Sequence, residues 1–481
     1  MFILSFVKII SILLSIVGVT FLFPIGVAVA YGETHVILPF LVPTVVSVVT
    51  MLAVNLPTRK YKIRMSIKQT FIIVAAAWVC ISIMGAIPLY FSGAFPRFVD
   101  ALFESVSGFS TTGATVCTDV EVLPRSINLG RCLYHWIGGM GIVTLTVALM
   151  PLLGVGGFQL IKAETTGPEK GKVTARITTT AKILWLIYIG MTVVETILLM
   201  IFGMDFVDAV THAFSTVGTG GFSSKNDSIG AYNSLQIDIT VTVFMFLCGI
   251  NFSLFFYLIT KKFSDIRENT EFKVYVGIVV VIVLAVSFCL LSQNKHFGQN
   301  LHTAAFHVVS AITTTGFSIG DFTIWPYSAQ FLLFLLFFIG GCSGSTGGGI
   351  KVVRWVILFK QINNETKRML HPHGVFSIRL NNRVGRKDIV FNVTAFIALY
   401  LFFVGLTTFI GCLGNLDIFS SFSGALSVVG NIGLAYGSLG PGGGFANIPD
   451  FVKIWYSFAM LAGRLELYTM IIYFMPSYWK K

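Results

Sequence analysis

Charged side chains are scarce in this sequence. Asp, Glu, Lys and Arg make up 11% of its 481 residues, against about 25% in a typical soluble domain. No polar stretch is long enough for a separate soluble domain, since the longest, 360–387, has the length of a loop. Hydrophobic residues make up 55% of the chain and form long runs, so we predict an integral membrane protein.

Sequence motifs for metal, nucleotide and nucleic-acid binding are also missing. The seven Cys residues form no Cys-x-x-Cys motif and lie mostly in apolar segments, which favours small buried side chains. The Gly-rich stretch 340–349 lacks the Gly-Lys-Ser/Thr of a phosphate-binding loop. The net charge of +12 sits in short loops that offer no aromatic platform on which bases could stack. We therefore expect no organic cofactor and no nucleic-acid partner.

Ten apolar segments have the length of membrane-spanning helices. They lie near 3–30, 36–56, 69–91, 127–153, 181–204, 235–260, 272–292, 327–359, 389–413 and 451–475. In the first of them Lys8 precedes an apolar run that ends in Ala28-Val29-Ala30, as in a signal peptide, but the run 9–30 is long enough to span the bilayer and is predicted to remain uncleaved.

A shorter pattern ending in glycine occurs four times between these segments. The glycines are Gly113, Gly221, Gly316 and Gly433. Thirteen residues earlier stand the predicted helix N-caps Asp100, Asp208, Thr303 and Ser420. Six residues earlier stand Ser107, Ser215, Ser310 and Ser427. A capped helix of about 11 residues extends about 16 Å, half the thickness of a bilayer core. Each copy is therefore predicted to be a re-entrant half-helix.

The predicted fold is an all-α integral membrane protein with ten transmembrane helices and four re-entrant pore half-helices. These elements form four parallel M1-P-M2 repeats around a single-chain pore. The predicted divisions are an N-terminal helix pair with a basic loop and then four pore repeats, at 1–68, 69–180, 181–271, 272–385 and 386–481.

The distribution of charge predicts the orientation in the membrane. Most of the 33 Lys and Arg residues lie on the side opposite the half-helices, chiefly at 59–68, 162–182, 261–273 and 351–387. The positive-inside rule places this side and both termini in the cytoplasm. Acidic residues outnumber basic ones in the outer loops, which would concentrate cations there. The alternative is that several of these acids only cap helices.

The residues at each glycine are predicted to form a selectivity filter. They are Thr111, Thr112, Gly113, Thr219, Gly220, Gly221, Thr314, Thr315, Gly316, Asn431, Ile432 and Gly433. Glycine allows the positive φ that directs successive carbonyl groups toward one axis. A ring of carbonyls suits a large, weakly hydrated cation such as K⁺, and the negative ends of the half-helices favour it further. Either Gly220 or Gly221 could be aligned with Gly113, so the register of the second turn is left open by one residue.

The four glycine motifs and the helix plan resemble the TrkH/TrkG/KtrB superfamily of bacterial potassium-uptake subunits over nearly the whole chain. The two additional N-terminal helices are more similar to the TrkH branch. The resemblance implies a K⁺-selective pore in a homodimer of the bacterial inner membrane. It also implies a TrkA-type cytosolic nucleotide-binding regulatory subunit that docks on the basic face. Sodium-passing relatives carry serine at the first filter position, where this chain has Gly113.

A second feature interrupts the apolar segment 327–359. It consists of Gly340, Gly341, Cys342, Ser343, Gly344, Ser345, Thr346, Gly347, Gly348 and Gly349. So many glycines disfavour a helix, and non-helical backbone within a membrane must line a cavity or protein. We predict an intramembrane gate below the filter, as the resemblance also implies. The alternative is a passive kink that allows close packing.

Arg464 lies about halfway along the last apolar segment. Arginine at that depth costs about 2.5–3.5 kcal/mol on insertion scales. We predict that it projects into the pore beneath the filter as an electrostatic barrier, in agreement with the resemblance. The alternative is an ion pair with a carboxylate on another helix, such as Glu195.

Two other functions are consistent with the residues. Glu104, His212, His307 and Gly424 stand nine residues before the four glycines. The first three would suit zinc in an intramembrane metalloenzyme, although hydrogen bonds that support the half-helices are the preferred interpretation. An ion-coupled secondary K⁺ or Na⁺ transporter would need an acid within the membrane, and Glu195 is a candidate. The preferred prediction is potassium uptake by a protein that is not an enzyme.

Overall fold

The computed structural model describes residues 2–59, 61, 66–141, 177–293, 295–374, 376–381, 383–384, 387–441, 443–472 and 475–476. In chain order its elements are α1 (Phe2–Thr20), α2 (Leu22–Ala30), α3 (Thr34–Asn55), α4 (Ile67–Phe91), α5 (Phe98–Phe109), α6 (Arg125–Gly139), α9 (Ile177–Ile201), α10 (Phe206–Gly218), η2 (Ser228–Tyr232), α11 (Leu235–Cys248), α12 (Phe252–Ile259), α13 (Phe263–Glu268), α14 (Thr270–Leu290), α15 (Phe297–Ile312), η3 (Phe322–Ile324), α16 (Tyr327–Leu335), η4 (Leu336–Phe338), α17 (Val352–Leu370), β1 (Arg379–Leu380), β2 (Arg383–Val384), α18 (Lys387–Leu413), α19 (Ile418–Gly430), η5 (Gly437–Leu439), α20 (Asp450–Arg464) and α21 (Tyr468–Ile471).

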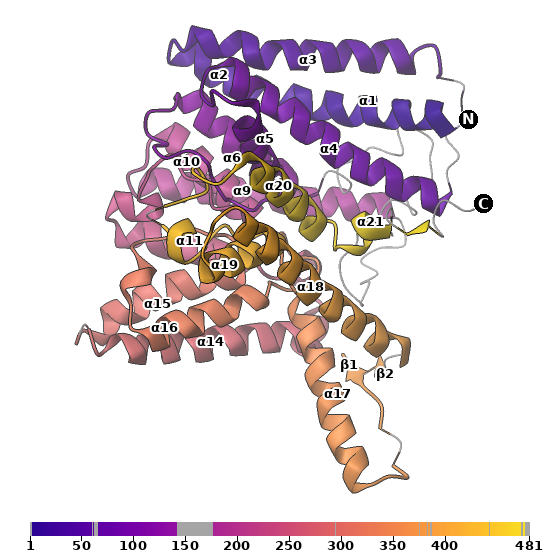
Figure 1. The fold of residues 1–481 in the computed structure, drawn as a ribbon, viewed down its shortest axis with the longest axis vertical. Coiled ribbons are helices and arrows are strands. Elements are labelled where there is room, and N and C mark those ends of the chain that lie inside the picture. Colours follow the sequence, from indigo (N-terminus) through magenta and orange to yellow (C-terminus); the bar gives the residue numbers. More distant parts are fainter. Residues whose placement is uncertain are drawn as a thin grey trace.

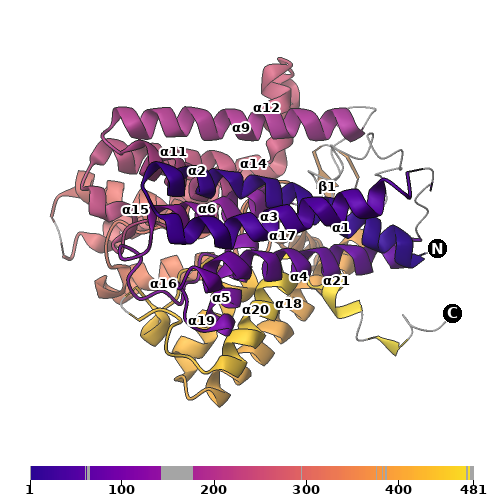
Figure 2. The ribbon, with the colours of Figure 1, turned by 90° about the horizontal axis from the view of Figure 1, so that it is seen from above.

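Long apolar helices form the body of the protein. Among the described residues, six stretches are long and apolar enough to cross a membrane, and a bent helix pair makes a possible seventh. They are Ile3–Ala30, Thr34–Asn55, Lys68–Phe91, Ala181–Ile201, Thr270–Leu290 and Ile389–Leu413. Figures 1 and 2 show α1, α3, α4, α9 and α14 running roughly parallel, with both chain ends at one end of the bundle. This architecture supports the predicted multi-pass membrane protein.

Two of the predicted continuous spans differ from the structure. The segment 235–260 bends by 94° between α11 and α12. At this bend, the Cys342 amide donates to the carbonyl of Gly249, and the Phe252 amide donates to the carbonyl of Gly344. The segment 451–475 is broken after α20, where Glu466 and Leu467 both have positive φ. The break in 327–359 is confirmed, since no helix lies between η4 and α17.

Some predictions fall outside the described residues. The predicted span 127–153 is seen as α6, which ends at Gly139, and its part beyond residue 141 is not described. The same holds for most of the predicted basic loop 162–182 and for the last residues of the chain.

Four short helices, the half-helices α5, α10, α15 and α19, lie at the predicted positions and have 12, 13, 16 and 13 residues. Their predicted N-caps are wrong, because Asp100, Asp208, Thr303 and Ser420 lie inside the helices. The observed side-chain caps of α10 and α19 are Asp205 and Asp417, which accept from the amides of Asp208 and Ser420. The acidic side chain of the cap stands three residues earlier than the pattern suggested.

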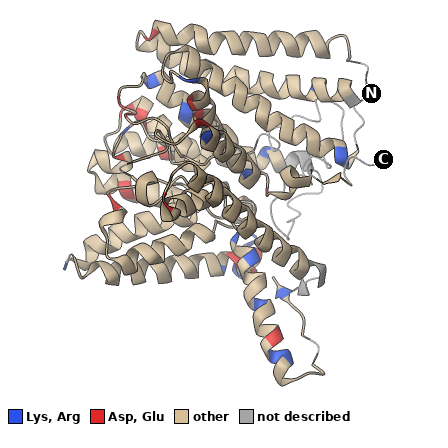
Figure 3. Cartoon of the chain, in the orientation of Figure 1, with Lys and Arg blue, Asp and Glu red and all other residues tan. Residues whose placement is uncertain are grey.

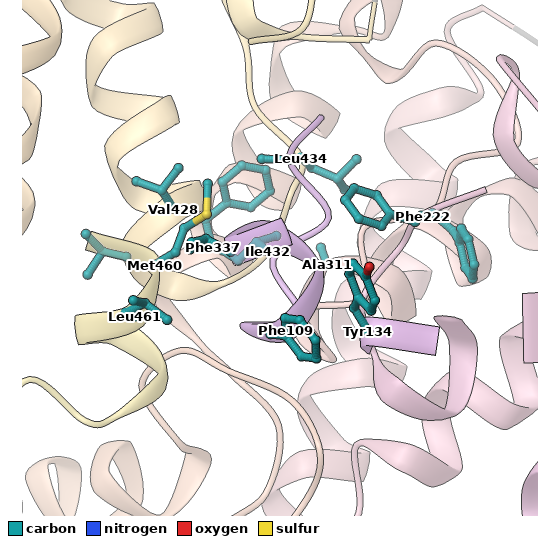
Figure 4. Close-up of a cluster of buried hydrophobic side chains, with 14 of the residues drawn as sticks. Phe109, Tyr134, Phe222, Ala311, Phe337, Val428, Ile432, Leu434, Met460 and Leu461 are labelled. Carbon is teal, nitrogen blue, oxygen red and sulfur yellow. The ribbon is translucent and has the colours of Figure 1, made fainter. Parts of the chain in front are cut away.

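Apolar side chains fill the space behind the ends of these half-helices. The rings of Phe109 and Tyr134 stack with centroids 4.4 Å apart. Figure 4 shows them near Ala311 and Phe222, with Ile432 and Met460 across the cluster. The side chains come from segments far apart in the sequence, so this core ties the four turns to one another.

Charged residues are distributed unevenly. Figure 3 shows few of them along the long helices, whereas they gather in the loops opposite the chain ends and along α17. The amphipathic α17 extends beyond the bundle (Figure 1). Near it the antiparallel hairpin of β1 and β2 pairs Arg379 with Val384, the one departure from an all-helical fold in the part of the chain that is described.

Candidate functional site

The four half-helices end in the same turn. The first residue of each turn is left-handed, with φ of 56° at Thr111, 54° at Thr219, 56° at Thr314 and 52° at Asn431. Two residues later each glycine also has a positive φ, of 77°, 83°, 87° and 83° in chain order. Non-glycine residues rarely adopt the left-handed conformation. Four identical occurrences therefore indicate a backbone shape that the surrounding structure maintains.

Equivalent backbone hydrogen bonds hold the four turns. The amide of the middle residue donates to the carbonyl of the serine five residues earlier. These bonds are Thr112 to Ser107 (2.9 Å), Gly220 to Ser215 (2.8 Å), Thr315 to Ser310 (2.9 Å) and Ile432 to Ser427 (2.9 Å). This is the six-to-one bond that closes a helix C-terminus. It gives the repeated serines a role and aligns Gly220 with Thr112, which settles the register left open by the sequence.

The four glycines close into one ring. A Cβ atom added to any of them would overlap a backbone carbonyl oxygen of the next turn. The contacts run from Gly113 to Gly220, from Gly221 to Thr315, from Gly316 to Ile432 and from Gly433 back to Thr112. The circular order of the contacts shows that the four turns surround one axis. Each half-helix therefore directs the negative end of its dipole toward the same ring.

The Gly-rich loop lies directly against this ring. A Cβ on Gly347 would meet the carbonyl of Thr313, and one on Gly348 would overlap that of Gly430. The Gly348 amide also donates to the hydroxyl of Thr314 at 2.6 Å. The loop folds back on itself, with the Gly340 amide donating to the carbonyl of Ile350 at 2.9 Å. It is thus in contact with the third and fourth turns.

Two charged side chains that the sequence patterns do not single out hold the loop. The buried carboxylate of Glu271, on α14, accepts from the amides of Ser343 (2.6 Å) and Val353 (3.1 Å). The buried Lys351 ammonium donates to the carbonyl of Gly347. Both residues lie at the border of an apolar segment, and this position is the sequence pattern that could have identified them. Glu271 and Lys351 together anchor the backbone at Ser343, Gly347 and Val353.

Arg464 joins the loop to the first repeat. It is the last residue of α20 instead of lying within a continuous helix. Its guanidinium donates to the carbonyl of Thr346 at 2.8 Å and to those of Gly138 and Gly139 at 2.6 and 3.1 Å. Among the described residues, no ion pair joins it to Glu195, the carboxylate that the alternative named as an example. The nearby Glu466 pairs with Arg354 at 2.9 Å.

The residues considered for zinc support the half-helices instead. Buried Glu104 accepts from the Arg131 guanidinium at 2.8 Å and from the Val116 amide at 3.0 Å. His212 bonds to the carbonyl of Asp208 and to Ser223, and His307 to the carbonyl of Thr303. Within the described part of the chain no group of three His, Cys, Asp or Glu residues could hold a metal ion. The preferred interpretation of these residues is confirmed.

Several acidic residues on the half-helix side of the bundle form ion pairs. Asp100 contacts Arg97 and Lys453, Asp205 contacts Arg125, and Glu121 contacts Lys225. The side chain of Asn226 donates to Asp119 at 2.8 Å and lowers the pKa of that carboxyl, which keeps it ionised. The observed pairs neutralise part of the predicted negative surface, whereas Asp119 retains its charge.

The comparisons with known proteins agree with this geometry. The family described as TrkH, cation transport protein, matches residues 42–481. The Trk system potassium uptake protein TrkH of Escherichia coli K12 is 38% identical over 434 residues, 88% of this chain and 89% of that protein. Its namesake from Halomonas elongata is 37% identical over 484 residues, 98% of both chains.

A solved structure matches over its whole length. The crystal structure of the potassium transporter TrkH from Vibrio parahaemolyticus superposes with a TM-score of 0.88 at 32% identity, covering 100% of both chains. The bundle and ring thus define a membrane protein of the cation-transport class, a transporter and not an enzyme. The chain belongs to the TrkH family.

Proposed function

We propose that this protein takes up potassium across the bacterial inner membrane through the ring of four glycines. The observation that carries the proposal is the closed circle of contacts from each glycine to a carbonyl of the next repeat. Carbonyl oxygens replace the hydration shell of an entering cation. The negative ends of α5, α10, α15 and α19 attract the ion without a buried carboxylate that would hold it too tightly. K⁺ passes because it gives up its water more readily than Na⁺.

The proposed architecture has ten membrane crossings and four re-entrant half-helices in four M1-P-M2 repeats, 69–180, 181–271, 272–385 and 386–481. It is supported by the equivalent turns and by the position of each half-helix between two apolar segments. Both termini lie in the cytoplasm, on the side of the basic loops.

The Gly-rich loop acts as the gate in this proposal. It contacts the third and fourth turns of the ring, and Arg464 connects it to α6 of the first repeat. A cation that leaves the ring on the cytoplasmic side therefore meets the loop and the charges of Arg464 and Lys351. For the gate to open, the loop must break the hydrogen bonds that connect it to the ring, to Arg464 and to its other neighbours.

Replacement of Arg464 by alanine is expected to raise the rate of potassium entry about tenfold. A unit charge about 12 Å from a cation opposes it by about 1.4 kcal/mol at an effective dielectric constant of about 20, and about 1.4 kcal/mol corresponds to a tenfold change in rate. The measurement is ⁸⁶Rb⁺ uptake into proteoliposomes. Arg464→Lys retains the charge and should stay near the wild-type rate. A folded alanine variant with an unchanged rate would contradict the barrier.

Association with other proteins is part of the proposal. We expect a homodimer and a TrkA-type cytosolic nucleotide-binding regulatory subunit on the basic face. The exposed apolar side chains of Phe359, Ile362, Met369 and Leu370 on the projecting α17 support an interface there (Figure 1). A regulator bound at this helix would act on the gate directly, because α17 begins where the Gly-rich loop ends.

A flux assay tests the proposed function. Purified protein in liposomes should admit K⁺ and Rb⁺ far faster than Na⁺, with no pH gradient and no second ion required. One observation favours an ion-coupled transporter instead: both carboxylate oxygens of Glu195, on α9, are buried and have no hydrogen-bond partner among the described residues. Uptake that depends on a proton or sodium gradient, and is lost in Glu195→Gln, would support that second function.

A further inference from the structure

One position of the ring breaks the fourfold pattern. The middle residue of the turn is Thr112, Thr315 and Ile432 in three repeats, but Gly220 in the second. The φ of Gly220 is not positive, so its backbone conformation does not require glycine. The reason for the missing side chain must therefore lie in what surrounds it.

The ring of His135 occupies the space that a side chain at this position would need. A Cβ atom on Gly220 would overlap the Cγ, Nδ1 and Cε1 atoms of that imidazole. His135 lies on α6 of the first repeat and is completely buried. A residue from a different repeat thus fills the place that the turn's own side chain fills elsewhere.

The imidazole contacts the second turn on both sides. Its Nδ1 lies 3.1 Å from the hydroxyl oxygen of Ser215, whose carbonyl accepts the Gly220 amide. Its ring stacks on Phe222, with centroids 4.2 Å apart and an interplanar angle of 22°. Phe222 directly follows the ring glycine Gly221. His135 therefore braces the backbone on either side of the carbonyl of Gly220.

Side chains at the equivalent positions hold their own turns. The Thr112 hydroxyl lies 2.7 Å from that of Ser110 and accepts from the Asn431 amide group at 2.9 Å. The Thr315 hydroxyl lies 2.8 Å from that of Thr313. The second turn has no such side chain, and the imidazole provides the packing that the hydroxyl groups provide elsewhere.

We propose that His135 is a positioning residue of the cation path, and that residues 135 and 220 form a coupled pair that sets the discrimination between K⁺ and Na⁺. The proposal rests on the proposed function. The imidazole fixes the carbonyl of Gly220 at the spacing that suits the larger dehydrated cation. Without it this carbonyl can move toward a smaller one, because a cavity opens behind the turn.

A double-variant experiment in proteoliposomes tests the pair. His135→Ala is expected to lower the ratio of Rb⁺ to Na⁺ uptake about tenfold, a change of about 1.4 kcal/mol in relative cation preference. Gly220→Thr alone should lose uptake, because the threonine and the imidazole need the same space. The combination of Gly220→Thr with His135→Ala should regain uptake and selectivity, because it restores the side chain found in the first and third turns.

The outcomes separate this inference from the proposed function. Leu13→Ala, at a buried position of α1, serves as the control for lost stability and should leave the ion ratio unchanged. A selective wild type whose ratio survives His135→Ala, or a double variant no better than Gly220→Thr alone, would overturn the pair. If His135→Ala does not fold, the comparison of the double variant with Gly220→Thr alone still tests the pair. A wild-type protein that does not discriminate between the ions would instead overturn the proposed function.

Discussion

A protein carrying Gly113→Ser is expected to lose selective potassium uptake while remaining folded. The φ of Gly113 is 77°, and a Cβ there would overlap the carbonyl oxygen of Gly220. The carbonyl must therefore turn or move away, so that one quarter of the ring no longer coordinates the ion. Removal of one correctly placed carbonyl is expected to reduce discrimination against Na⁺ by at least about tenfold.

The ratio of Rb⁺ to Na⁺ uptake into liposomes measures this effect. Gly405→Ala is the matched control, because Gly405 lies within α18 and no atom of the described part of the chain lies within 4 Å of a Cβ placed there. The control should keep the wild-type ratio. Because the four contacts are equivalent, Ser at Gly221, Gly316 or Gly433 should have the same effect. If Gly113→Ser kept the ratio of the control, the ring would not be the selective site.

The second large effect is expected at the buried ion pair of Arg131 and Glu104. Their side chains are 1% and 0% exposed, and the guanidinium also stacks on Phe222 at 4.2 Å. The removal of one partner leaves an uncompensated charge in a dry interior, which costs about 3–5 kcal/mol. Glu104→Gln and Arg131→Met are each expected to cause a large decrease in the midpoint temperature of thermal unfolding of the purified protein.

A double variant distinguishes the charge from the packing. Glu104→Gln combined with Arg131→Met removes both charges and should recover much of the lost stability. Arg368→Met is the surface control, because its pair with Glu365 is half-exposed and such pairs contribute about 0–1 kcal/mol. Single variants as stable as this control would refute the structural role given to the pair.

Much of the site could be predicted because it is encoded locally. Four glycines at equivalent positions, each after a short helix, indicate a repeated turn, and the observed backbone angles repeat as expected. The break at 340–349 also follows from local composition, since six glycines in ten residues cannot stabilise a helix.

The remaining features depend on contacts between distant segments. The bend between α11 and α12 forms where their junction exchanges hydrogen bonds with the Gly-rich loop, almost a hundred residues later. The break after Arg464 coincides with the pairing of Glu466 and Arg354. The relation of His135 to Gly220 needs the fold as well, because no spacing in the sequence links α6 to the second turn. Apolar periodicity alone predicts continuous spans in such places.

The most direct test of the central claim is a crystal structure determined with Rb⁺ as the permeant cation, in which anomalous scattering locates the ion. The account predicts a peak on the axis of the ring, coordinated by carbonyl oxygens from all four repeats. It also predicts that the peak weakens in the Gly113→Ser protein. Rubidium bound elsewhere, with the ring empty at saturating concentrations, would contradict the claim that the four turns form the path of the ion.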